Sequence, residues 1–235
     1  MKFIYYLAAI GTPDIETKIN ILQHNLEYIY KNINEKYDII INCYNSYEII
    51  KKTIQDIKFL NNKYFYNKEG ILTELWLTNP YNDKLNEYEY ILFILDDVRI
   101  DNMDINNMIE IKKKYNIEIL SPKIINSTHK YMNEYNNITI HNFLEIYCLL
   151  LCPIDFIKYS LMNTIENKWM WGPDLLFGHY KIYACVNNNY SATHMIPSKS
   201  NKEEAYKLMN KYFTQKRFTL DYINKTYMPV KNILL

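Results

Sequence analysis

The sequence predicts an α/β fold with a mixed, mostly parallel sheet flanked by helices. Short apolar runs at residues 3–10 and 37–43 alternate with segments whose apolar residues recur at helical spacing, most clearly residues 15–33. Strands and helices that alternate in this way are typical of parallel strands joined by right-handed crossovers. A chain of 235 residues with 49% hydrophobic residues can also bury a substantial core.

Turn and capping residues set the boundaries of the first elements. Gly11, Thr12 and Pro13 break the chain after the first strand, and Ser46 is a candidate N-cap for a helix over residues 47–58. The pattern then predicts a short polar-aromatic strand and a short helix before Pro80, at residues 63–67 and 71–77.

The same patterns continue through the second half of the chain. Helices are predicted at residues 101–115, 153–162 and 201–213, and strands at residues 117–120, 143–152 and 182–186. Two polar segments have no clear period: residues 126–137, which we expect to form an irregular loop near the site, and residues 214–235.

A buried strand that ends in two carboxylates is the main candidate for a functional site. Residues 91–95 form an apolar run that suits a strand buried on both faces, and Asp96 and Asp97 follow it. Adjacent residues point to opposite sides of an extended chain, so we expect Asp97 to face a ligand at the carboxyl edge of the sheet. Oxygen ligands in small number suit Mg²⁺ or Mn²⁺ shared with substrate phosphates. The structural alternative is that the pair only opens a turn and that Asp101 caps the next helix.

A second informative stretch runs from Trp169 to Gly178. Gly172 permits a turn, and Pro173 and Asp174 suit the start of a helix, where a carboxylate is favoured. Asp174 therefore has a purely structural interpretation beside a catalytic one. Trp169 and Trp171 can form a platform for the apolar face of a sugar ring, or belong partly to the core.

Composition excludes some partners and favours a reduced compartment. The 27 Lys and Arg residues balance 26 Asp and Glu residues without a basic block, which disfavours nucleic-acid binding. The four cysteines lie in apolar segments without metal-site spacing, which fits buried thiols in the cytoplasm, or the host cytoplasm for a viral protein. We expect no signal peptide and no transmembrane segment.

In order and spacing, these features resemble the nucleotide-sugar glycosyltransferases of the GT-A fold, over roughly residues 2–213. The matching segments are Leu95-Asp96-Asp97-Val98, Trp171-Gly172-Pro173-Asp174 and His194. The first segment departs from a clean Asp-x-Asp pattern. The resemblance places the chain among small, divergent members, similar to glycosyltransferases encoded by large DNA viruses.

The resemblance implies a role for each candidate residue. Asp97 and His194 would bind Mn²⁺ or Mg²⁺ on the donor diphosphate, Asp96 would lie near the ribose, and Asp174 would be the general base of an inverting transfer. The donor would be a UDP-sugar and the acceptor a hydroxyl of a glycan or another molecule. The nucleotide-binding half would be about residues 1–100, the acceptor half about 101–213 and the tail 214–235 of one domain.

The remaining candidates line the expected nucleotide and acceptor positions. The uridine would lie at Ala9, Thr12, Tyr44 and Asn45, with the diphosphate under Lys199 or Arg217 and the acceptor on Trp169 and Trp171. Two alternatives stay open: a nucleotidyltransferase, although only four glycines are present, and a degenerate GT-A domain that binds a glycan or a protein.

Overall fold

A computed structural model describes residues 2–70, 72–127, 137–196, 202–218 and 229–233. The strands are β1 (Phe3–Gly11), β2 (Tyr37–Tyr44), β3 (Leu60–Asn67), β4 (Tyr90–Ile94), β5 (Val98–Asn102), β6 (Ile119–Ile125), β7 (Ile138–His141), β8 (Cys148–Leu151), β9 (Ala184–His194) and β10 (Pro229–Ile233). The helices are α1 (Ile15–Ile33), α2 (Tyr47–Ile54), α3 (Leu72–Leu77), α4 (Ile105–Tyr115), α5 (Pro153–Ser160) and α6 (Lys202–Gln215), with the 3₁₀ turns η1 (Pro80–Glu87) and η3 (Pro173–Leu176).

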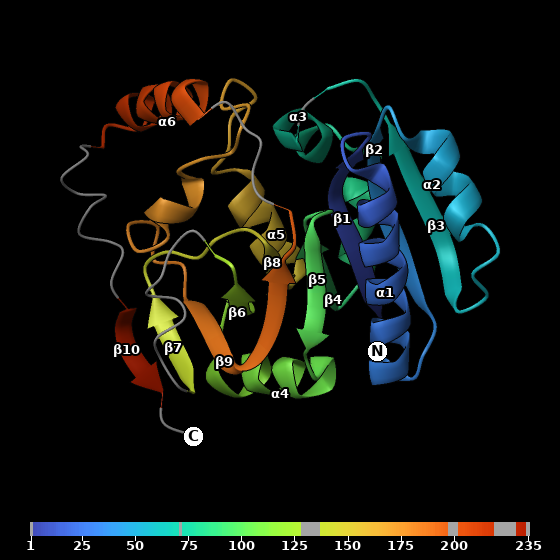
Figure 1. Cartoon of the computed structure of the whole chain (residues 1–235). Helices are drawn as coiled ribbons and strands as arrows, with labels where there is room; N and C mark the ends of the chain where they lie inside the picture. Colours follow the sequence, from blue (N-terminus) through green and yellow to red (C-terminus); the bar gives the residue numbers. More distant parts are fainter. Residues whose placement is uncertain (1, 71, 128–136, 197–201, 219–228, 234–235) are drawn as a thin grey trace.

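All these strands belong to one mixed sheet, as the sequence predicted (Figure 1). Its order is β10-β7-β9-β6-β8-β4-β1-β2-β3, and β5 pairs with β9 beside this path. The parallel pairings β1–β2, β1–β4, β2–β3 and β6–β9 have longer registers than the antiparallel ones among the described residues. Because β1, β2, β3 and β4 run parallel to one another, their carboxyl ends lie at the same edge of the sheet, where open α/β sheets bind ligands.

Two apolar cores form on the two faces of the sheet, because successive strand residues point to opposite faces. Strand β1 contributes Phe3, Tyr5 and Leu7 to one core and Ile4, Tyr6 and Ala8 to the other. Helices α1 and α4 cover the first face, whereas α3, α5 and α6 cover the second. The N-terminal elements predicted from periodicity are therefore confirmed.

Several predicted boundaries in the second half are wrong. Residues 98–102 form strand β5, and the helix begins at Ile105, where the Asp104 side chain accepts a hydrogen bond from the amide of Asn107; Asp101 is not its cap. Strand β6 continues through Pro122 to Ile125 with a register shift after the proline. Strand β9 extends to His194, and β8 is shorter than predicted.

The C-terminal tail differs from the prediction, and the predicted polar loop is mostly not described by the structure. Residues 229–233 of the tail pair with β7 as strand β10, which no periodicity in the tail indicated. Most of the loop predicted at 126–137 lies outside the described residues.

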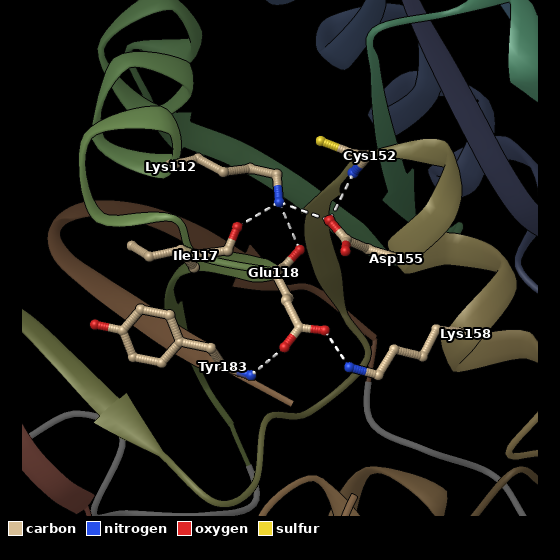
Figure 2. Close-up of polar contacts among 7 residues, drawn as sticks. All are labelled: Lys112, Ile117, Glu118, Cys152, Asp155, Lys158 and Tyr183. Atoms are coloured by element: carbon tan, nitrogen blue, oxygen red, sulfur yellow. Dashed lines mark hydrogen bonds and ion pairs between the residues drawn. The ribbon is translucent and has the colours of Figure 1, made fainter. Parts of the chain in front are cut away.

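A buried ion pair joins α4 to α5 (Figure 2). The Lys112 ammonium lies 2.8 Å from Oδ2 of Asp155 and also donates hydrogen bonds to the main-chain oxygens of Ile117 and Glu118. The Glu118 carboxylate in turn accepts a hydrogen bond from the amide of Tyr183, just before β9. These contacts tie the two helices to the strand ends between them, and none involves the predicted site residues.

Candidate functional site

Asp96 and Asp97 form a tight turn between β4 and β5. The amide of Val98 donates a hydrogen bond to the main-chain oxygen of Leu95 at 3.4 Å, which closes the turn. Because β4 is parallel to β1, the turn lies at the sheet edge where β1 also ends. The position predicted for this acidic pair is confirmed.

The structure brings Asp97 and His194 into direct contact. Oδ2 of Asp97 lies 3.0 Å from Nε2 of His194, because β5 and β9 pair with Val98 opposite His194. The amide of Met195 also donates to the main-chain oxygen of Asp97 at 2.8 Å. Burial lowers the pKa of His194, but the hydrogen bond to the Asp97 carboxylate, the negative charges of Asp97 and Glu145 and a main-chain contact at Asn126 together outweigh it, so the net pKa is raised.

The second oxygen of Asp97 lacks a partner. Oδ1 is buried and has no hydrogen-bond partner within the described structure. A buried unpaired carboxylate oxygen is costly unless something else binds it. Asp97 and an adjacent imidazole are a donor set that fits Mn²⁺ or Mg²⁺ whose remaining ligands come from phosphate and water. In the part of the chain that the structure describes, no group of three or more His, Cys, Asp or Glu side chains could hold a metal by itself.

Asp96 pairs with a lysine of helix α1. Its Oδ2 lies 2.7 Å from Nζ of Lys18, which also donates to the main-chain oxygen of Gly11 at 3.4 Å. Burial raises the pKa of Asp96 to about 6, while the Lys18 charge opposes the shift. Asp96 and Asp97 therefore have separate partners, Lys18 and His194.

Tyr44 and the ends of β1 and β2 complete this edge. A Cβ placed on Gly11 would lie 2.0 Å from Cζ of Tyr44, so the ring rests directly on the Gly11 backbone. Ser46 occupies the predicted N-cap position of α2, but its hydroxyl donates to the main-chain oxygen of Ile10 instead of capping the helix. Ala9 is buried at 7% exposure, whereas Thr12 and Asn45 are exposed.

Asp174 lies in the short 3₁₀ turn η3 instead of at the start of an α-helix. Gly172 precedes it with a positive φ of 104°, and its Cα faces α6, where an added Cβ would lie 2.7 Å from the Phe213 ring. Burial and then the negative charge of Glu145 raise the pKa of Asp174 to about 8, although nearby main-chain amides lower it. The side chain can therefore carry a proton near neutral pH.

The residues predicted to bind the acceptor and the diphosphate differ in their exposure. Trp169 and Trp171 are both partly buried, and Trp171 makes an edge contact with Tyr206 of α6 at 5.1 Å between ring centroids. Arg217 is exposed just after α6, and no ion pair from it to the acidic pair is found among the described residues. Lys199 lies outside the described residues.

Two glycosyltransferases share this architecture. GalNAc-T7, solved with UDP, GalNAc and Mn²⁺, matches with a TM-score of 0.65 and 7% identity over 97% of this chain and 50% of its own. TarS from S. aureus matches with a TM-score of 0.61 and 14% identity over 92% of this chain. The chain has the GT-A fold.

The match covers nearly all of this chain but only part of the TarS structures. A shorter TarS structure in complex with UDP-GlcNAc matches with a TM-score of 0.55 and 14% identity, over 97% of this chain and 70% of that one. The chain spans 39% of the longer TarS structure. No family model and no curated protein sequence matches it. Among the described residues, no helix is both long enough and apolar enough to cross a membrane.

Two residues beside the candidate site were missed by the sequence analysis. Lys18 is a charged residue in helix α1, and charged residues on a helix usually face water. Only its position in line with the apolar stripe of that helix could have indicated that it is buried. Glu145 is 6% exposed between β7 and β8, and its charge acts on both His194 and Asp174. It lies in the segment 143–152, which the sequence pattern predicts as a strand, so no local pattern indicates a buried charge at this position.

Proposed function

We propose that this protein is a metal-dependent, inverting glycosyltransferase that moves a hexosyl or deoxyhexosyl group from a UDP-sugar to a hydroxyl of a glycan or another acceptor. The observation that supports it most directly is the Asp97–His194 pair at the carboxyl edge of a GT-A sheet, with Oδ1 of Asp97 left without a partner. GalNAc-T7 and TarS, which share the fold, were solved with UDP, Mn²⁺ or a UDP-sugar.

Asp97 and His194 are the residues that would hold Mn²⁺ or Mg²⁺. A bound divalent ion neutralises charge that develops on a leaving diphosphate. Asp97 Oδ1 is free to bind it, and Nε2 of His194 can do so once it gives up its contact with Oδ2. Two protein ligands leave the other positions to phosphate oxygens and water, as Mg²⁺ sites usually do.

Asp174 is the proposed general base. A base works best when its pKa lies near the working pH, and burial raises the pKa of Asp174 to about 8. Its carboxylate would accept the proton of the attacking hydroxyl. Trp169 and Trp171, which precede it and remain partly exposed, would bind the acceptor.

The uridine would occupy the edge formed by β1 and β2. Asp96 would accept hydrogen bonds from the ribose, and the half-buried Tyr44 ring would stack on the base. Ala9, Thr12 and Asn45 line the same edge. Lys199 and Arg217 are proposed to lie over the diphosphate.

Calorimetric titration of UDP with and without Mn²⁺ tests this proposal. We expect Mn²⁺-dependent binding by the native chain and its loss in Asp97→Ala. Asp174→Ala should still bind UDP but should not turn over a UDP-sugar. Absence of UDP binding under both conditions would overturn the assignment and favour a degenerate GT-A domain that binds a glycan or a protein.

A further inference from the structure

Helix α1 places a buried cation against the nucleotide edge. Lys18 is 8% exposed and belongs to the buried stripe of this helix: Lys18, Ile21, Leu22, Asn25, Leu26, Ile29 and Ile33. Lysine is almost never this buried unless it is paired. Its partner is Asp96, whose side chain is 15% exposed.

The contacts of Asp96 fix the direction of its carboxylate. Oδ2 is held by the Lys18 ammonium at 2.7 Å, and the ammonium is itself anchored on the main-chain oxygen of Gly11 at the end of β1. The same helix also binds the strand that follows the turn. The Asn25 side chain donates a hydrogen bond from Nδ2 to the main-chain oxygen of Val98 and accepts one at Oδ1 from the main-chain amide of Ile100. Helix α1 therefore holds the acidic turn at two points.

Stability alone does not account for this pair. A buried ion pair contributes little net stability compared with apolar residues of the same size, because both charges lose their hydration. An apolar residue at position 18 would continue the stripe of α1. What the lysine adds is a carboxylate held in one orientation, which is the requirement for a directional hydrogen-bond acceptor.

We propose that Lys18 is a positioning residue that orients Asp96 toward the ribose hydroxyls of the nucleotide and so sets a preference for ribonucleotides over deoxyribonucleotides. This inference depends on the proposed function, because it requires a uridine nucleotide at the β1–β2 edge. Lys18 itself does not touch the ribose; it acts through Asp96.

The test compares binding of UDP, 2′-deoxy-UDP and 3′-deoxy-UDP, each with Mn²⁺, to the full chain and its variants. A hydrogen bond to a charged group corresponds to about 10- to 100-fold in affinity, so the native chain should prefer UDP over at least one deoxy analogue by that factor. In Lys18→Met this preference should fall below about threefold, with the weaker analogue bound almost as well as before.

Lys112→Met is the matched control, because Lys112 is also a buried lysine paired with an aspartate (Figure 2). Its partners Asp155, Ile117 and Glu118 do not belong to the nucleotide edge. The Lys112→Met variant should keep the native preference. Circular dichroism establishes that each variant is folded; if either methionine variant is not, Lys18→Gln and Lys112→Gln replace the pair with the same expectations.

Three results would overturn the inference while leaving the glycosyltransferase proposal in place: no preference in the native chain, an unchanged preference in the Lys18 variant, or an equal loss for UDP and both analogues. The last result would mean that Lys18 contacts the diphosphate. Failure of the native chain to bind UDP at all would overturn both proposals.

Discussion

Nε2 of His194 lies 3.0 Å from Oδ2 of Asp97, and the two residues are 97 positions apart in the chain. Strand pairing makes this contact, since β5 begins directly after Asp97 and runs antiparallel to the end of β9. The Tyr147 ring also packs against the imidazole, with 4.6 Å between the ring centroids and 30° between the ring planes. The pair is therefore fixed by the sheet before any ligand arrives.

His194→Gln should weaken the Mn²⁺-dependent part of UDP binding by at least about tenfold, the scale seen when even the supporting residues of a metal site are removed. Calorimetry with UDP in Mn²⁺ and in chelator measures this part directly. His24→Gln is the control, because that ring contacts the main-chain oxygen of Ile100 and the Tyr28 ring and makes no described contact with Asp97. Equal effects of the two substitutions would remove His194 from the proposed metal site.

The raised pKa of Asp174 predicts how turnover depends on pH. Below about 8 the carboxyl is mostly protonated and cannot accept a proton, so kcat should rise with pH through that value. Glu145→Gln removes a negative charge that raises this pKa, and should shift the profile to lower pH. A profile that is flat from pH 6 to pH 9, or unmoved in Glu145→Gln, would contradict the role of Asp174 as the base.

The same pKa predicts a change in stability. In the unfolded chain Asp174 loses its proton near the ordinary value of 3.8, whereas in the folded chain it keeps the proton up to about 8. The folded state therefore binds more protons over this interval, and the contribution of Asp174 to stability falls as pH rises through it. Asp174→Asn should raise the melting temperature relative to the native chain at pH 8 but not at pH 4, while it lowers kcat by about 10²- to 10⁴-fold.

The sequence predicted the parts of the site that depend on local patterns. Asp97 follows an apolar run whose length alone indicates a buried strand, and the strand places it at the edge. Strand β5 was not predicted, and its last two residues were assigned to the following helix, because a five-residue strand that pairs with a distant segment gives only a short alternation of apolar and polar residues.

The buried charges were not predictable for a different reason. Lys18 and Glu145 are residue types that usually face water, and only tertiary packing shows that they are buried. The same holds for β10, whose pairing with β7 joins two segments with no shared local signal.

Gly11→Ala should disturb the uridine edge through Tyr44. The new Cβ would lie 2.0 to 2.6 Å from the Tyr44 ring, so the ring must move, at a cost of about 1–3 kcal/mol in the free energy of unfolding and with weaker UDP binding. In a Tyr44→Ala background the clash is gone, and the additional effect of Gly11→Ala should vanish in a double-mutant cycle. Gly70→Ala is the control, because the atom nearest to its Cβ would be a carboxylate oxygen at the flexible end of the Glu74 side chain, at 2.9 Å. Additive effects of the Gly11 and Tyr44 substitutions would show that the ring does not rest on Gly11.

Lys112→Met should destabilise the fold far more than Lys158→Met, although both lysines pair with a carboxylate in the same network (Figure 2). Lys112 is 4% exposed at its side chain, and its removal leaves the buried Asp155 charge unpaired, which costs about 3–5 kcal/mol. Lys158 is 43% exposed, and loss of its pair with Glu118 costs about 0–1 kcal/mol, because water replaces it. Urea denaturation measures both as shifts of the midpoint at constant slope. Similar losses of stability in the two variants would mean that water reaches Asp155, and would contradict the burial of the Lys112–Asp155 ion pair.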